Sequence, residues 1–195
     1  MYLKRMKQIG CAVAVTLAVA TAGCGEFQTD SRSPVRLVIS RLSASSGATP
    51  DQLGEGLSSD VVTVVRVTPP GSTTEIGVPT IFGDGGQVAM TLVLRDQGPA
   101  GLVTEPSLLN QVTITRYGVT YRRTDGRNTP GVDVPFPIDS GVTFTVPPTD
   151  VVTASFLLVR NTAKEEAPLL ALRTSGVLLS TIADVTFYGR DLAGN

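Results

Sequence analysis

The stretch Val88-Ala89-Met90-Thr91-Leu92-Val93-Leu94 decides the fold class. Its larger apolar side chains stand at every second position, at Val88, Met90, Leu92 and Leu94. Successive side chains of a β strand point to opposite faces, so this period of two is typical of a half-buried strand. The sequence therefore predicts a strand with one face in a hydrophobic core.

The same alternation recurs along the chain from residue 35 onward. Further strands are predicted at 35–40, 61–67, 111–123, 142–146, 151–160 and 181–190. The run 61–67 is dense in β-branched residues, and we interpret it as a central strand buried on both faces, with an exposed edge strand as the alternative. Only the segment 163–173 has a helical composition, and Pro168 limits it to a turn or two.

Glycine and proline separate these predicted strands. Turns are predicted at Pro69-Pro70-Gly71, Gly83-Asp84-Gly85-Gly86, Asp125-Gly126, Pro130-Gly131 and Pro147-Pro148. About seven short strands with one apolar face predict an all-β fold, an antiparallel β-sandwich with one short helical segment near 163–173. The full chain has 42% hydrophobic and 17% charged residues, and the range 35–195 is long enough to form a single folded domain.

The predicted strand 111–123 changes its inward face part-way along. Val112 and Ile114 occupy even positions, whereas Tyr117, Val119 and Tyr121 occupy odd ones. One extra residue restores the alternation, as a β-bulge does. The change of parity beside Gly118 predicts a bulge within 116–118.

The N-terminal residues form an export signal. Residues 1–7 carry three positive charges, and residues 9–22 carry none and are rich in alanine, valine and leucine. A basic start, a short apolar run and small residues are typical of a secretory signal peptide, and the run is shorter than a membrane span. An ordinary signal peptide is one interpretation; a lipoprotein signal is the other, and the one we favour.

Thr21-Ala22-Gly23-Cys24 resembles the lipobox of bacterial lipoproteins. The resemblance implies cleavage between Gly23 and Cys24 and acylation of Cys24 with fatty chains such as palmitate. The polar composition of the residues that follow predicts a flexible tether over 24–34. Gly25 in place of an aspartate implies sorting to the outer membrane of the cell envelope. The other cysteine, Cys11, lies in the segment removed, so no disulfide is expected.

The composition excludes several kinds of catalytic and metal site. The chain has no histidine and no tryptophan, which excludes catalytic triads with histidine, cysteine–histidine pairs and histidine-based zinc sites. Without residues 1–23, 13 basic residues face 17 acidic ones, so electrostatic attraction to nucleic acid is not expected. We expect no catalytic activity, no metal and no cofactor.

The densest polar and aromatic cluster is a candidate ligand-binding loop. It consists of Tyr121, Arg122, Arg123, Asp125, Arg127 and Asn128. Guanidinium groups suit carboxylates, phosphates and sugars. The alternative is a solvated strand end whose arginines pair with Asp125 or Asp133.

Other acidic residues are weaker candidates. Asp84 between glycines, and Asp125 with Asn128, lack the spacing of a calcium loop and are interpreted as turn residues. Glu165 and Glu166 are assigned only a structural role at a helix start. Two of Asp139, Asp150, Asp184 and Asp191 would be needed as paired carboxylates of a glycan-acting enzyme, and without tryptophan we do not favour this reading.

The last residues, Thr186 to Asn195, resemble the closing strand and turn of bacterial immunoglobulin-like domains. The resemblance implies an immunoglobulin or fibronectin-III type of sandwich. The hypothesis is a lipid-anchored envelope module that binds or scaffolds an envelope protein or a glycan. The alternatives are an accessory subunit of an outer-membrane or envelope assembly, a carboxylate-dependent enzyme and a calcium-stabilised adhesion module.

Overall fold

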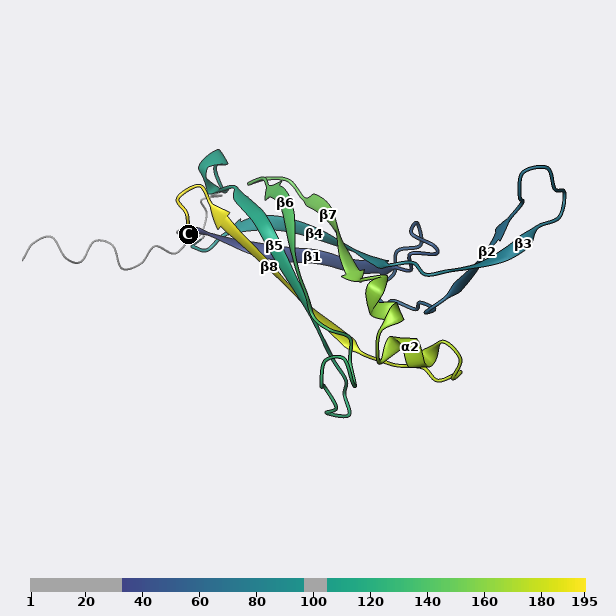
Figure 1. Cartoon of the computed structure of the whole chain (residues 1–195). Coiled ribbons are helices and arrows are strands. Elements are labelled where there is room, and N and C mark those ends of the chain that lie inside the picture. The colour runs from purple at the N-terminus through teal and green to yellow at the C-terminus, as the bar shows by residue number, and fades with distance from the viewer. Residues whose placement is uncertain (1–32, 97–104) are drawn as a thin grey trace, which may run out of the picture. The chain divides into compact units, whose positions relative to one another are not determined.

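The computed structural model describes residues 33–96 and 105–195, and within these ranges eight strands form three antiparallel sheets (Figure 1). The first sheet, the β4 sheet, has the order β1 (Val35–Ser45), β4 (Asp84–Leu94) and β7 (Val152–Val159). The second, the β5 sheet, has the order β6 (Ile138–Val146), β5 (Val112–Arg122) and β8 (Ile182–Asp191). A hairpin of β2 (Thr63–Val67) and β3 (Ile76–Thr80) is the third.

The fold is an all-β antiparallel sandwich, as the sequence predicts. The signal, Cys24 and most of the predicted tether lie outside the described residues. Three short helices complete the described part: η1 (Leu108–Asn110), η2 (Thr162–Glu165) and α2 (Leu169–Leu172). The last two occupy the segment predicted as helical, and Pro168 lies at the start of α2.

The core lies between the two central strands. Val88, Met90 and Leu92 of β4 are buried, which confirms the inward face predicted from their alternation. The facing side chains of β5 are Tyr117, Val119 and Tyr121, also buried. An edge-to-face contact of Tyr117 with Phe156 of β7, at 5.4 Å between ring centroids, joins the two sheets. Apolar burial of this kind is the main favourable term in folding.

The parity change in β5 is confirmed, but the bulge lies at Thr115, not within 116–118. The register of β5 skips Thr115 against both β6 and β8. Alternation alone places the extra residue somewhere between Ile114 and Tyr117, both of which point inward. The bulge was predicted beside Gly118 because glycine often occurs at bulges, but Gly118 pairs regularly with Asp139 and Thr186.

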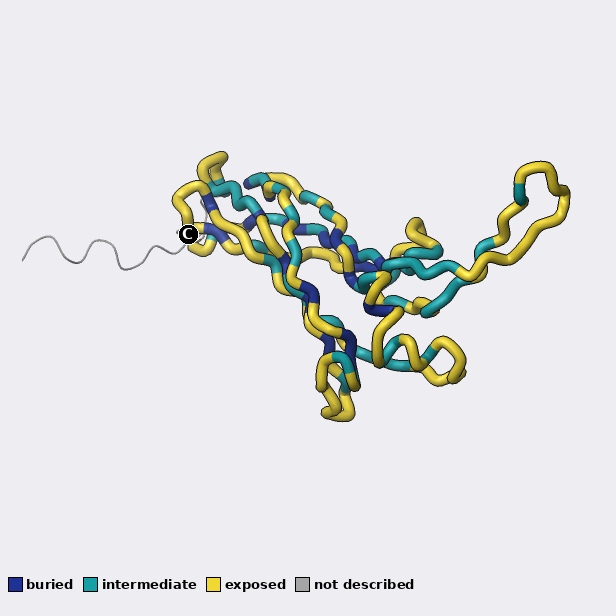
Figure 2. The backbone as a smooth tube through the Cα atoms, viewed as in Figure 1, coloured by how far each residue is buried: buried dark blue, intermediate teal, exposed yellow. Residues whose placement is uncertain are grey.

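The interpretation of 61–67 as a central, doubly buried strand is wrong. β2 begins at Thr63 and pairs with β3, and the hairpin is mostly exposed (Figure 2). Val64 is 63% exposed. β-Branched residues favour strands because they suit an extended backbone, but this preference does not report burial. Gly71, with φ of 80°, lies in the predicted turn between the two strands.

The predicted turn at 83–86 is also wrong, because β4 already begins at Asp84. Gly86 pairs with Phe156, and the ring of Phe156 lies against the glycine Cα. A side chain at 86 would overlap this ring. The glycine is therefore required for close packing within the sheet and not for a reversal of the chain.

Candidate functional site

The predicted ligand loop spans the end of β5 and the connection to β6, and the pleat of β5 divides it. Tyr121 points inward, and its hydroxyl donates to the carbonyl oxygen of Leu158 at 2.6 Å. Burial raises the pKa of Tyr121 to about 12, partly offset by the positive charge of Arg160. Tyr121 is thus a core residue that joins the two sheets, and it presents no ring to a loop ligand.

Arg122 points to the opposite face of the same strand. Its Nε donates to Oδ2 of Asp184 on β8 at 2.7 Å, and both side chains are about half exposed. Exposed pairs of this kind contribute little to stability. The structure therefore separates Arg122 both from Tyr121 and from the loop.

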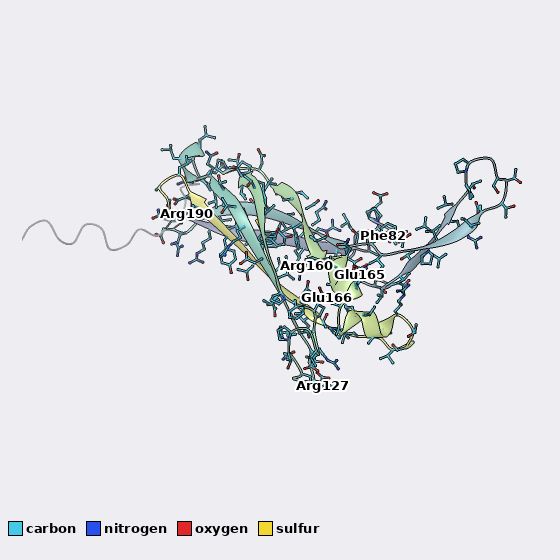
Figure 3. The ribbon with its side chains drawn as sticks, in the orientation of Figure 1. Phe82, Arg127, Arg160, Glu165, Glu166 and Arg190 are labelled. Atoms are coloured by element: carbon cyan, nitrogen blue, oxygen red, sulfur yellow. The ribbon has the colours of Figure 1, made fainter. Side chains whose placement is uncertain are left out.

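The remaining four residues do lie together. Arg123 and Arg127 both donate to the carboxylate of Asp125, the latter through Nη2 at 2.9 Å. The hydrogen bonds from Arg123 and then Arg127 lower the pKa of Asp125 to about 2. Asn128 Oδ1 accepts from the backbone N–H of Arg123 at 2.6 Å, and Figure 3 shows Arg127 at the tip of this connection.

The loop is consequently closed by its own residues. Pairing with Asp125 is the alternative set out from the sequence, whereas Asp133 instead accepts from the backbone N–H of Thr129 at 3.2 Å. An incoming carboxylate or phosphate must compete with Asp125 for both guanidinium groups. Ligand binding at this loop stays a prediction.

A buried ion pair that sequence reasoning missed joins β4 to η2. Lys164 Nζ lies 2.9 Å from the carboxylate of Asp84, and the two side chains are 4% and 1% exposed. Lys164 also donates to Ser59 Oγ at 2.8 Å and to the carbonyl oxygen of Asp60 at 3.0 Å. All three ammonium protons therefore have an acceptor.

The carboxylate is equally well satisfied. Asp84 Oδ1 accepts from Ser59 Oγ at 2.8 Å and from the backbone N–H of Gly47 at 3.0 Å. The interpretation of Asp84 as a turn residue is wrong, since it begins a strand and is buried. A buried carboxylate and ammonium with complete hydrogen bonding hold the loops around Gly47 and Ser59 against the sandwich. No signal in the sequence pairs two residues 80 positions apart.

A cavity of about 500 Å³ lies between β1 and β8. Apolar side chains dominate its lining, among them Leu42, Phe156, Leu158, Ala183 and Val185. Glu55 is its one carboxylate. A second cavity of about 260 Å³ contains Asp60 and Asp84, of which Asp84 is neutralised by Lys164. Neither lining offers the two free carboxylates that glycoside hydrolysis uses.

The comparisons with known proteins add no assignment. No protein-family model matches the chain, and neither a curated protein nor a solved structure matches it. In the part of the chain that the structure describes, no group of three or more histidine, cysteine, aspartate or glutamate residues is placed to hold a metal ion. The helices of the same part are all too short or too polar to cross a membrane.

Removing one partner of the buried ion pair is expected to destabilise the domain strongly. Lys164→Met leaves Asp84 buried without a countercharge, and we expect the free energy of unfolding to fall by about 3–5 kcal/mol. Urea denaturation followed by circular dichroism measures the loss.

Two variants separate charge from packing in that experiment. Ser59→Ala should cost only about 1 kcal/mol, because the ion pair remains. Lys164→Met combined with Asp84→Asn should recover part of the loss, since the buried charge is then removed. Equal stability of Lys164→Met and the wild type would contradict the role assigned to the pair.

Alkaline pH should destabilise the domain through Tyr121. The folded state holds the hydroxyl proton up to a pKa of about 12, whereas the pKa of a solvent-exposed tyrosine is about 10. A pKa raised by folding gives stability that is complete below pH 10 and is lost as the pH rises toward 12. Urea midpoints across this range should therefore fall more steeply for the wild type than for Tyr121→Phe. Parallel curves would show that Tyr121 ionises as readily in the folded protein as in the unfolded chain.

Proposed function

We propose that this chain is a lipid-anchored module of the bacterial cell envelope that binds or scaffolds a partner and does not catalyse a reaction. The observation that carries the proposal is the sequence that ends at Thr21-Ala22-Gly23-Cys24, a charged start and an apolar run before small residues and a cysteine. The β-sandwich that follows is a scaffold suited to display at a surface.

The anchor defines how such a module works. Each methylene of an acyl chain buried in the membrane contributes about 0.8 kcal/mol, and a single chain binds only marginally. The two or three chains implied by the lipoprotein resemblance hold the domain at the membrane permanently. A binding partner is then an envelope protein or glycan within reach of the tether, with the outer membrane as the proposed location.

Specific side chains favour the second candidate, an accessory subunit of an envelope assembly. Val67 and Ile76 lie opposite each other on the β2–β3 hairpin, and Val65 and Val78 lie beside them on the same face. Val67, Ile76 and Val78 are all exposed. A contiguous apolar face on a soluble domain marks a protein interaction site. The hairpin supports a lasting protein contact over a free-standing module.

The anchor is tested by Cys24→Ala. We expect the wild type to fractionate with membranes and the variant to move to the soluble fraction, because acylation at this residue supplies the attachment. Mass spectrometry of the wild type should show fatty chains on the residue that begins the mature polypeptide. Cys11→Ala is the matched control and should leave fractionation unchanged. A Cys24→Ala variant that stays in the membrane with unchanged mobility would contradict the proposal.

The accessory-subunit candidate is tested on the hairpin. Cross-linking in membranes, followed by purification of the acylated protein, should recover an envelope protein whose yield falls several-fold with Val67→Ser and Ile76→Ser together. Leu109→Ser, an exposed apolar position on η1, is the control. Equal recovery from all three proteins would exclude the hairpin as the contact.

A further inference from the structure

In the described part of the chain, the outer edge of β8 has no strand neighbour from Ile182 to Arg190. β8 pairs with β5 on one side, and among the described strands none pairs with the other side. The ten residues Ile182–Asp191 contain no proline and no lysine, and their register against β5 has its one shift at Thr115 of β5 itself. A long, regular edge with free N–H and C=O groups is a template for another strand.

The two edges of the β4 sheet are partly protected. On β7, the Leu157 N–H donates to Tyr117 Oη at 3.1 Å, and the Leu158 carbonyl accepts from Tyr121. On β1, Ala44 exchanges two backbone hydrogen bonds with Gly54, and a bulge at Ser40 interrupts the strand. β6 contacts β7 of the other sheet but does not pair with it. Among the described residues, the edge of β8 has no such interactions, and it is distinguished from the edge of β6, which is also unpaired, by the charges it carries at Asp184 and Arg190.

The inward face of β8 is incompletely covered as well. Val185 and Phe187 pair with Val119 and Tyr117 of β5, so they point into the same core. Their β5 partners are buried, whereas Val185 and Phe187 are only half-buried. The apolar layer thus continues to the edge of the sheet and stops there without a neighbour.

β1, across the cavity from β8, also has apolar side chains that are incompletely covered. Ile39 and Leu42 pair with Met90 and Val88, which are 0% exposed. Ile39 and Leu42 themselves are 46% and 42% exposed. The two sheets are in contact where β6 lies near β7, whereas a largely apolar cavity of about 500 Å³ lies between β1 and β8.

We propose that β8 pairs antiparallel with the β8 strand of a second copy of this chain, across a two-fold axis at Phe187. In this register, the side chains that lie opposite each other on the two β8 strands match in charge and in size. Asp184 lies opposite Arg190 of the partner, twice by symmetry, and Thr186 lies opposite Tyr188. Arg190 is exposed and has no ion-pair partner among the described residues (Figure 3).

The pairing also covers apolar side chains of β8 that are only half-buried in the single chain. The two Phe187 side chains meet on the inward face, and Val185 of each copy lies opposite Gly189 of the other, where no side chain obstructs it. The β5 sheets of two copies become one sheet of six strands, and the uncovered side of each sandwich is buried. This assembly does not depend on acylation of Cys24, so its test is separate from that of the anchor.

The proposal predicts a dimer of the full chain purified in detergent under reducing conditions. Sedimentation should give twice the chain mass in the micromolar range. Arg190→Glu places two carboxylates opposite each other at both ends of the pairing and should weaken the dimer by about tenfold or more. Arg190→Glu combined with Asp184→Asn removes the repulsion between the carboxylates without placing a cation beside Arg122, and should recover part of the dimer.

Arg66→Glu is the matched control, because Arg66 is an exposed strand arginine on β2, outside the β5 sheet. It should leave the dimer unchanged, and melting curves should show that all variants are folded. A monomer at every concentration would overturn the proposal. A dimer that Arg190→Glu does not weaken would place the contact on another surface and overturn it equally.

Discussion

The two sheets are held together by the packing of their central strands, β4 and β5. Val88 and Met90 on one strand and Val119 and Tyr117 on the other exclude water between the sheets. The described residues contain no cysteine, so this apolar contact has to supply most of their stability without a disulfide. The edge strands, the hairpin and the loops are placed by their pairing with these two.

Much of this arrangement could be predicted from the sequence, because a strand with one buried face has apolar residues at every second position. The face of β4 and the parity change in β5 follow from a period of two, which depends only on local geometry. The exposure of β2 does not follow, since its valines would suit a buried strand equally well. Burial depends on what packs against a strand, and that is decided by residues distant in the chain.

The candidate loop also depends on contacts between distant residues, but the alternation of β5 already indicated the orientation of one of its members. Grouping Tyr121 with Arg122 treated neighbours in sequence as neighbours in space, although the alternation through Val119 and Tyr121 already placed the tyrosine on the inward face. The closure of Arg123 and Arg127 on Asp125 is local and was foreseen as an alternative. The Asp84–Lys164 pair joins distant segments and needed the structure to be found.

Lys164 is the only lysine after residue 7, and it is buried in an ion pair. Beyond residue 7, the folded chain consequently offers no accessible side-chain amine to acylating reagents or to proteases that cut after lysine. Reaction at this position has to wait for the η2 segment to open and release the ammonium group into water. The chain thus carries a built-in chemical reporter, whose labelling rate measures how often this part of the molecule comes apart.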